Sequence, residues 1–270
     1  MSVNFRLNDK VVVVTGAGGV IGCRASEVLL EAGAKVALLD IDIQNLETLG
    51  KKLSKIKPSN LMIVECDVSS ADSVKKSVDT VVQKWDSVDV LFNNAASKSD
   101  NIESFFAPFE DYSIECWRSI MSVNIDGMML MAQAVGKQML KQGRGGSMIQ
   151  TASIYGLVAP DQRIYEGSRY LETSINTPAV YSVSKGAVVA LTKYLAAYWG
   201  TKGIRVNTLT PGGVESWQND VFKRKYSERV PLGRMARVDD LMGAILYLAS
   251  DASSYVTGQN LVVDGGWTTW

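Results

Sequence analysis

A chain of 270 residues that is 46% hydrophobic is long enough for one large α/β domain with a substantial core. It carries 28 Lys and Arg against 28 Asp and Glu, and this balance argues against nucleic-acid binding through bulk charge. The absence of histidine excludes Ser-His-Asp and Cys-His catalysis and the commonest zinc sites, so we expect no metal. Because neither a signal peptide nor a membrane-spanning run is evident, we expect a soluble cytoplasmic protein that makes no membrane contact.

Short apolar runs alternate with stretches of helical periodicity along the chain. The apolar runs predict strands at about 11–15, 35–40, 61–66, 88–92, 146–151, 204–209 and 260–263. The periodic stretches predict helices at about 20–32, 43–55, 71–85, 115–141, 180–200 and 238–249. This alternation is typical of a doubly wound parallel sheet with helices on both faces. The irregular stretch 152–179 is long for a compact domain, and such segments are usually functional or mobile.

A glycine cluster, TGAGGVIG at 15–22, lies between the first predicted strand and the first predicted helix, which is the context of a dinucleotide-binding turn. Gly16 permits the tight turn, and Gly18 or Gly19 lets backbone N–H groups approach a pyrophosphate. Gly22 lets the helix pack closely on the strand, so that the helix N-terminus faces the phosphates. The predicted cofactor residues of this turn are Gly16, Gly18, Gly19, Val20 and Ile21.

The second predicted strand ends in Asp40, and this residue predicts the choice of cofactor. Its carboxylate can accept hydrogen bonds from the adenosine ribose hydroxyls and would repel a 2′-phosphate. The glycine turn contains no Arg or Lys, and residues 41–43 are Ile-Asp-Ile. The sequence therefore favours NAD over NADP.

The segment YSVSK places Tyr181 and Lys185 four residues apart on a predicted helix, where they share a face. A phenol close to an ammonium group and an oxidised nicotinamide, both positive, loses its proton more readily, because the anion is favoured. Such a tyrosine can exchange protons near neutral pH in a protein that has no histidine for the task.

Several motifs follow one another in a fixed order along the chain. They are the glycine turn, Asp67-Val68, NNAA at 93–96, Asn124 in VNIDG, Ser153 in TASIYG, YSVSK, PGGV at 211–214 and the C-terminal YVTGQNLVVDGG. With this set the chain resembles the short-chain dehydrogenase/reductase family over nearly its whole length. The resemblance implies a single Rossmann-type domain over residues 1–270 with a seven-stranded parallel sheet. It also implies a nicotinamide cofactor and a homotetramer or, failing that, a homodimer.

The resemblance assigns catalytic roles to four residues. Tyr181 matches the proton donor and acceptor, and Lys185 matches the residue that binds the nicotinamide ribose and lowers the pKa of the tyrosine. Ser153 matches the hydroxyl that holds the substrate oxygen, and Asn124 matches the residue that positions a water in a proton relay to the lysine. The resemblance also implies further cofactor contacts: Asp67 and Val68 at the adenine, Asn94 and Ala95 beside the central strands, and Pro211, Gly212, Val214 and Ser216 around the nicotinamide.

Two features depart from the family pattern. Single-domain members usually have TGxxxGxG, but this chain has Val20 where that pattern needs glycine and fits the TGxxGxxG spacing of larger sugar-nucleotide-modifying members. Since there is no room for their extra domain, we expect a single domain whose turn uses Gly19 instead. The second departure is the 28-residue spacing from Ser153 to Tyr181, about twice the usual value, which defines an insert at about 161–178.

The insert lies between two catalytic residues, so we expect it to border the substrate pocket. Its polar composition favours a hydroxylated or anionic small molecule such as a sugar or sugar phosphate, and we predict substrate contacts from Arg163, Tyr165 and Arg169. Alternatively, the insert is a solvated loop or forms a subunit contact. Parts of the chain, including APDQRIYEG and NTPAVYSVSKGAV, also resemble a subgroup associated with bacterial surface sugars of the legionaminic type.

Three functions remain open from the sequence. The first is an NAD-dependent dehydrogenase that interconverts a secondary alcohol and a ketone on a sugar-like substrate. The second is a 3-oxoacyl-carrier-protein reductase, which would more often use NADPH and need a basic patch for its acidic carrier. The third is a non-catalytic protein that senses NAD, although such proteins typically lose the tyrosine or the lysine.

Overall fold

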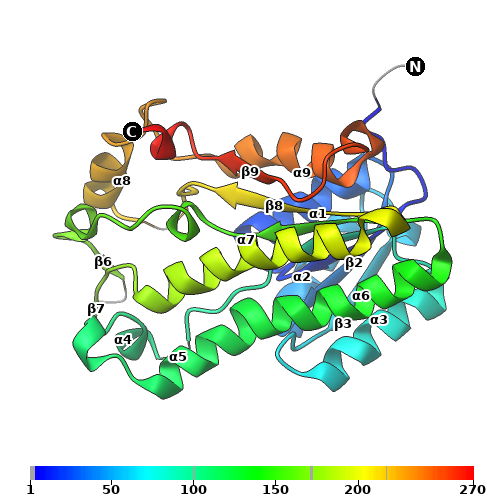
Figure 1. Ribbon diagram of the computed structural model, residues 1–270, viewed down its shortest axis with the longest axis horizontal. Coiled ribbons are helices and arrows are strands. Elements are labelled where there is room, and N and C mark those ends of the chain that lie inside the picture. Colours follow the sequence, from blue (N-terminus) through cyan, green and yellow to red (C-terminus); the bar gives the residue numbers. More distant parts are fainter. Residues whose placement is uncertain (1–3, 100, 171–172, 217) are drawn as a thin grey trace.

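The computed structural model describes residues 4–99, 101–170, 173–216 and 218–270, and these form an α/β fold around a seven-stranded sheet (Figure 1). The strand order is β3-β2-β1-β4-β5-β8-β9, and every pairing in this sheet is parallel. Its strands are β1 (Val11–Thr15), β2 (Lys35–Asp40), β3 (Leu61–Glu65), β4 (Val90–Asn93), β5 (Gly146–Thr151), β8 (Ile204–Pro211) and β9 (Asn260–Val263). All seven predicted strands and the doubly wound Rossmann-type architecture are confirmed.

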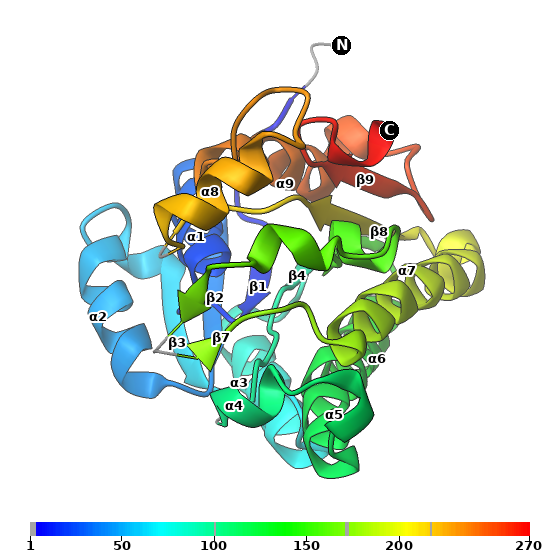
Figure 2. The same ribbon diagram turned by 90° about the vertical axis from the view of Figure 1, so that its left-hand side faces the viewer.

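The central strands are buried on both faces, which explains their uninterrupted apolar sequences. Val12 and Val14 of β1 face one hydrophobic cluster, whereas Val11 and Val13 face the other. The first cluster is covered by α1 (Val20–Glu31), α2 (Ile43–Leu53) and α9 (Met242–Ala249). The second is covered by α3 (Ala71–Trp85), α6 (Met128–Gln142) and α7 (Ala179–Trp199). Figure 2 looks toward the carboxyl ends of the strands and shows these two layers of helices on either side of the sheet.

The predicted helix at 115–141 is not continuous. It consists of α5 (Ile114–Met121), a π-helical turn at Ser122–Gly127, and α6. Side-chain periodicity does not reveal this turn, which contains Asn124. Such π-helical turns are frequent at functional sites.

Four short elements were not predicted. They are α4 (Ile102–Phe105), α8 (Asp220–Ser227) and the antiparallel pair β6 (Arg169–Tyr170) and β7 (Thr173–Ser174) within the insert. Figure 2 shows α4, α8 and the β6–β7 pair in front of the carboxyl ends of the strands. The short elements therefore gather at the end of the sheet where a ligand site is expected.

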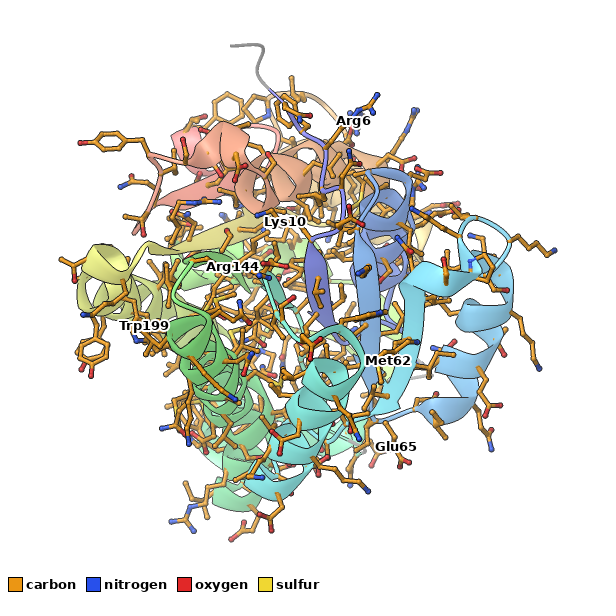
Figure 3. All side chains as sticks on the ribbon, turned by 90° about the vertical axis from the view of Figure 1, so that its right-hand side faces the viewer. Arg6, Lys10, Met62, Glu65, Arg144 and Trp199 are labelled. Atoms are coloured by element: carbon orange, nitrogen blue, oxygen red, sulfur yellow. The ribbon has the colours of Figure 1, made fainter. Side chains whose placement is uncertain are left out.

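The opposite end of the sheet is closed by structural contacts. Asp89 accepts hydrogen bonds from the backbone N–H of Val11 at 2.8 Å and from the guanidinium of Arg144 at 2.9 Å. Figure 3 shows Arg144 at this end, and Trp199 at the end of α7 beside α6. A Cβ at Gly136 of α6 would lie 2.4 Å from the Trp199 ring, so glycine allows this close packing. Within the described ranges, no helix is long and apolar enough to cross a lipid bilayer.

Candidate active site

A cleft of about 420 Å³ opens at the carboxyl ends of β1, β4, β5 and β8. Its lining comes from the segments that follow these strands, and also from the insert, α7 and α8. The strand order reverses between β1 and β4, and ligands of doubly wound sheets bind at such a switch point. The cleft is therefore the candidate active site.

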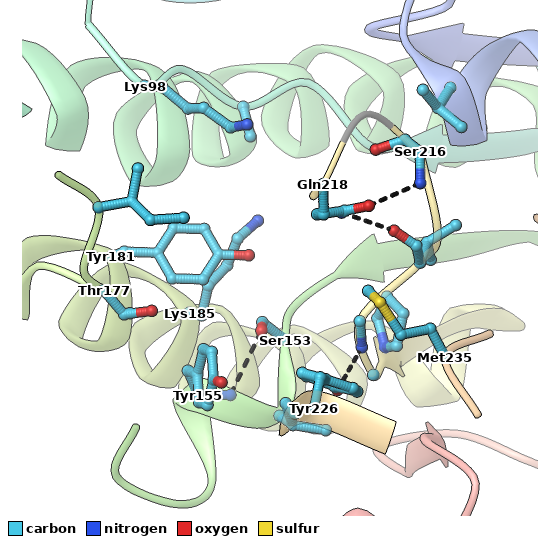
Figure 4. A pocket seen from close by; sticks show the side chains of 18 of the residues that line it. Lys98, Ser153, Tyr155, Thr177, Tyr181, Lys185, Ser216, Gln218, Tyr226 and Met235 are labelled. Atoms are coloured by element: carbon cyan, nitrogen blue, oxygen red, sulfur yellow. Dashed lines mark hydrogen bonds between the residues drawn. The ribbon is translucent and has the colours of Figure 1, made fainter. Parts of the chain in front are cut away.

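The cleft brings Ser153, Tyr181 and Lys185 together (Figure 4). Ser153 follows β5, and its hydroxyl accepts a hydrogen bond from the backbone N–H of Tyr155 at 3.3 Å. Lys185 Nζ donates to the carbonyl oxygen of Thr151 at 3.0 Å and lies 5.8 Å from the centre of the Tyr181 ring. A Cβ at Gly156 would lie 2.5 Å from the Lys185 carbonyl carbon, so this glycine lets the turn after Ser153 pack directly on α7.

The pKa values of Tyr181 and Lys185 in the protein without cofactor are set mainly by burial. Burial raises the pKa of Tyr181, and a hydrogen bond with Ser153 acts in the opposite direction. Burial also lowers the pKa of Lys185 to about 8, because the ammonium group is removed from water. In the protein alone, Lys185 therefore does not lower the pKa of Tyr181 below its usual value. The expectation of a readily ionised tyrosine includes the positive charge of a bound oxidised nicotinamide, so for the complex it stays a prediction.

Asn124 lies fully buried in the π-helical turn, and both ends of its side chain are used. Its Oδ1 accepts from the backbone N–H of Ser97 at 2.9 Å, and its Nδ2 donates to Ser184 Oγ at 3.3 Å. Ser184 in turn donates to the carbonyl oxygen of Tyr181 at 2.8 Å. Asn124 therefore ties the loop after β4 to the second turn of α7.

The glycine turn is held by steric and polar contacts. A Cβ at Gly22 would lie 2.2 Å from the carbonyl oxygen of Gly16, and one at Gly16 would lie 2.8 Å from Ala95 Cα. Gly16 also has a positive φ of 63°. Gly19 is the N-cap of α1 and offers no side-chain cap, so the first N–H groups of the helix are open to an anion. Val20 begins α1, is 53% exposed and lines the cleft together with Ile21.

Asp40 fixes the glycine turn to the end of β2. Its carboxylate accepts from the backbone N–H of Gly18 at 2.9 Å and from that of Asp42 at 3.1 Å. Asn45 Nδ2 donates to the carbonyl oxygen of Gly18 at 3.0 Å. A negative charge therefore stands at the carboxyl end of β2, directly beside the predicted pyrophosphate turn.

The remaining predicted cofactor residues follow β3 and β4. Asp67 accepts from the hydroxyl of Ser69 at 2.6 Å, and Val68 is buried against Gly127, the last residue of the π-helical turn. The backbone N–H groups of Asn94 and Ala95 donate to Thr15 Oγ1 at 2.9 and 3.0 Å. Of these predicted residues, Asn94 lines the cleft, whereas Asp67, Val68 and Ala95 lie outside its lining.

The PGGV turn forms the wall of the cleft after β8. Pro211, Gly212, Val214 and Ser216 all line it. Gln218 bridges this loop, because its side chain accepts from the N–H of Ser216 at 2.7 Å and donates to the carbonyl of Val214 at 3.0 Å. The loop therefore keeps its shape through a side chain that also faces the cleft (Figure 4).

The structure places only one of the three predicted substrate residues at the cleft. Tyr165 lines it, but Arg163 and Arg169 are exposed outside its lining. Arg163 pairs with Asp161 at 2.8 Å, which explains why its charge is held at the surface. The prediction that these arginines contact the substrate is therefore not supported by the geometry.

The insert and α8 are joined by a set of contacts that we call the clasp. Asp161 forms an ion pair with Arg229, and Lys225 Nζ donates to the carbonyl oxygens of Arg163 and Glu166 at 3.1 and 2.9 Å. The clasp also includes the stacked rings of Tyr165 and Phe222, whose centres are 5.3 Å apart. As expected, the insert borders the pocket.

The lining is more apolar than the insert's composition indicates, because aromatic side chains from distant segments converge there. Tyr155, Tyr165, Phe222, Tyr226 and Trp267 form a single buried cluster. Trp267 stacks on Tyr226 with the ring centres 4.3 Å apart, and Tyr226 OH accepts from the N–H of Gly213 at 2.5 Å. No sequence pattern marked Tyr226 as a site residue, since α8 is short and mostly polar.

A chain of hydroxyl groups lies within this aromatic wall. Thr177 Oγ1 and Tyr165 OH are 2.5 Å apart, and Tyr165 OH donates to Tyr155 OH at 3.2 Å. All three residues line the cleft beside Tyr181 (Figure 4 labels Thr177 and Tyr155). The insert therefore contributes hydroxyl groups to the site, and not the arginines that its composition favoured.

These residues fit a dinucleotide. The turn contains glycines at which a Cβ would collide with neighbouring atoms, a carboxylate stands at the end of β2, and the cleft lies next to both. In addition, the buried Thr151 Oγ1 has no hydrogen-bond partner within the described residues and belongs to the cleft lining.

Comparisons with known proteins agree with this site. A family model described as "Enoyl-(Acyl carrier protein) reductase" matches residues 16–268. The D-threitol dehydrogenase of Mycolicibacterium smegmatis is 35% identical, covering 98% of this chain and 95% of the relative. The NAD-dependent glycerol dehydrogenase of Listeria innocua is 31% identical, covering 98% and 96%. The crystal structure of a gluconate 5-dehydrogenase from Burkholderia cenocepacia in complex with NADP and tartrate has a TM-score of 0.86 at 31% identity, covering 99% of this chain and 98% of that one.

The chain therefore belongs to the short-chain dehydrogenase/reductase family. It is an enzyme, a nicotinamide-dependent oxidoreductase that interconverts an alcohol and a carbonyl compound. The non-catalytic alternative does not agree with this membership or with the complete set of Ser153, Tyr181 and Lys185.

Proposed function

We propose that this enzyme interconverts a secondary hydroxyl and a ketone on a polyol or sugar, with NAD(H) as the cofactor. The observation that carries the proposal is the hydroxyl chain from Thr177 to Tyr155, which lines the cleft beside Ser153 and Tyr181. Hydroxyl groups that can both donate and accept suit a substrate that bears several hydroxyls. The names of the D-threitol, glycerol and gluconate enzymes support the same substrate class.

The proposed mechanism assigns each step to a residue of the cleft. The bound nicotinamide supplies the hydride acceptor or donor. Ser153 Oγ holds the substrate oxygen, and Tyr181 OH takes its proton during oxidation or returns it during reduction. With the cofactor bound, the Lys185 ammonium would hold the nicotinamide ribose and, together with the positive nicotinamide, would favour the tyrosinate electrostatically. Since the Asn124 side chain is fully engaged, we assign its part in a proton relay to its backbone carbonyl.

The preference for NAD is supported by Asp40. A 2′-phosphate beside this carboxylate would meet a like charge, and Asp42 adds a second carboxylate two residues later. The glycine turn and the segment 41–43 contain no cation to compensate. Gly16, Gly18, Gly19 and the N-terminus of α1 would hold the pyrophosphate, and Val214 and Ser216 would border the nicotinamide.

We also propose a homo-oligomer, with a tetramer as the expected state. Met129 on α6 and Val183, Tyr194 and Tyr198 on α7 are exposed apolar or aromatic side chains, and Tyr194 and Tyr198 are each 64% exposed. Such side chains on neighbouring helices favour a symmetric contact.

The experiment that tests the function compares the protein with its Tyr181→Phe variant on a panel of alcohols. The panel contains D-threitol, glycerol, gluconate, a simple secondary alcohol, and an acetoacetyl thioester for the reverse reaction, each with both cofactors. We expect turnover of a polyhydroxy substrate with NAD and at least about a hundredfold loss in Tyr181→Phe, with cofactor affinity nearly unchanged. Reduction of the thioester with NADPH, without turnover of any polyol, would instead support the carrier-protein alternative.

A further inference from the structure

The hydrogen bonds along the hydroxyl chain have a fixed direction. A tyrosine hydroxyl carries one proton, and Tyr165 donates its proton to Tyr155 OH at 3.2 Å. In the 2.5 Å contact between Thr177 Oγ1 and Tyr165 OH, the donor is therefore Thr177. Tyr155 ends the chain, because its oxygen accepts a hydrogen bond and its own proton has no acceptor among the residues that the structure describes.

The insert holds the start of this chain in place. Gln162 Nε2 donates to the carbonyl oxygen of Thr177 at 2.9 Å, and the N–H of Thr177 donates back to Gln162 Oε1 at 3.2 Å. The Tyr165 ring is buried and stacks on Phe222 of α8. Both hydroxyl groups are therefore fixed by their neighbours, and together they set the direction in which Tyr155 can donate.

The Tyr155 hydroxyl stays protonated and belongs to the same turn as Ser153. Burial raises the pKa of Tyr155, and repulsion from the ionised forms of nearby tyrosines, including Tyr181, adds to this effect. Figure 4 shows Tyr155 directly beside Ser153, whose Oγ accepts from the backbone N–H of Tyr155 at 3.3 Å. A hydroxyl that already accepts a hydrogen bond is a stronger donor, and a buried donor without a partner is costly. An acceptor oxygen of the substrate would satisfy it.

We propose that Tyr155 is a specificity-determining residue that donates a hydrogen bond to an oxygen on the carbon next to the reacting carbon. This inference rests on the proposed function and refines it. Ser153 and Tyr181 hold the reacting oxygen, and an oxygen on the neighbouring carbon is the nearest further acceptor that a polyol or sugar offers. The preferred substrate is therefore a vicinal diol in oxidation and an α-hydroxy ketone in reduction. An isolated alcohol or ketone leaves the Tyr155 proton unpaired.

The test measures the reduction by NADH of three four-carbon ketones: butan-2-one, 3-hydroxybutan-2-one and butane-2,3-dione. The last two carry an oxygen on the neighbouring carbon, and the second oxygen of the dione can accept a hydrogen bond but not donate one. For each ketone, kcat/KM of the wild type is divided by that of Tyr155→Phe, which cancels differences in intrinsic reactivity. We expect this quotient to be roughly tenfold to a hundredfold larger for the hydroxy ketone and the dione than for butan-2-one.

Two further variants separate this role from a general effect on the fold. Tyr165→Phe keeps the Tyr155 hydroxyl but removes the bond that sets its direction, so it should act on the same ketones by a smaller factor. Tyr247→Phe removes a tyrosine hydroxyl from α9, outside the cleft lining, and should give the same quotient for all three ketones. An equal quotient for all three in Tyr155→Phe would overturn the inference, because Tyr155 would then serve the reacting oxygen or the fold. A large quotient for the hydroxy ketone alone would also overturn it, since Tyr155 would then accept the hydrogen bond.

A binding measurement keeps the inference independent of turnover. In the presence of NADH, 3-hydroxybutan-2-one should raise the Tm of the wild type more than butan-2-one does, and this difference should disappear in Tyr155→Phe. Equal Tm shifts for the two ketones in the wild type would contradict the role of Tyr155. If polyols are oxidised with NAD and Tyr155→Phe leaves the selectivity among the ketones unchanged, the proposed function holds and the inference about Tyr155 fails. Turnover of no polyol and no ketone, with no ligand-dependent Tm shift, overturns both.

Discussion

Replacing Lys185 with methionine should stabilise the protein without cofactor at neutral pH while it abolishes activity. Lys185 is 2% exposed, and burial lowers its pKa from 10.5 to about 8. A shift of that size corresponds to about 3 kcal/mol of destabilisation when the ammonium is charged. The hydrogen bond to the Thr151 carbonyl offsets about 1 kcal/mol. Methionine has a similar length and no charge to desolvate, so we expect a net gain of about 2 kcal/mol, or about 4–8 °C in Tm.

The stability gained by Lys185→Met should decrease as the pH rises. Because the folded pKa lies below the unfolded value, the unfolded chain binds more protons than the folded one between pH 8 and 10.5. The cost of Lys185 is therefore fully present below about pH 8 and disappears as the pH approaches 10.5. The advantage of Lys185→Met should accordingly shrink over this interval.

Urea unfolding at pH 7 and pH 10, followed by tryptophan fluorescence, measures this dependence. Lys193→Met is the matched control, since Lys193 is exposed on the same helix and its replacement should change stability little at either pH. The reasoning is refuted if Lys185→Met is less stable than the wild type at pH 7, or if its advantage is the same at both pH values.

Three further predictions follow from other parts of the structure. Asp40→Asn should raise NADP(H) affinity relative to NAD(H) by roughly thirtyfold, about 2 kcal/mol of lost repulsion, and an unchanged ratio in calorimetry would contradict it. Gly22→Ala should destabilise the protein by about 1–3 kcal/mol, because the new Cβ would lie 2.2 Å from the Gly16 carbonyl oxygen. In the control Gly243→Ala, the added Cβ on α9 would meet no atom within 4 Å, so this substitution should stabilise the protein by about 0.5–1 kcal/mol. Equal urea midpoints for the two variants would contradict the steric argument. Light scattering should give a mass that is a multiple of 29.4 kDa, and a monomer would exclude the oligomer.

The elements that the sequence predicts best are those whose pattern is local. Buried parallel strands appear as continuous apolar runs such as Val11–Val14, so the strands were found. The π-helical turn was missed because residues 122–127 continue the helical period on either side. Helix α8 was missed because only Phe222 and Tyr226 mark its buried face.

In the candidate site, too, residues marked by local motifs could be predicted, whereas positions set by long-range contacts could not. Ser153, Tyr181 and Lys185 could be identified from ordered motifs and their spacing, and the structure brings them together. The position of Arg163 outside the cleft lining could not be predicted, because its partner Asp161 also pairs with the distant Arg229, and such long-range pairing cannot be read from composition. The position of Lys98 in the cleft lining, two residues after the NNAA segment, was not predicted, because no pattern distinguishes a lysine that faces the cleft from one in solvent.

The clasp has a consequence for how molecules enter and leave the cleft. The insert and α8 are about sixty residues apart in the chain, yet Asp161–Arg229, the Lys225 hydrogen bonds and the Tyr165–Phe222 stack make them one mechanical unit. The insert therefore cannot move away from the cleft without moving α8 with it or breaking these contacts. We therefore expect substitutions at the Asp161–Arg229 ion pair to change the rates of substrate entry and product release while Ser153, Tyr181 and Lys185 stay the same.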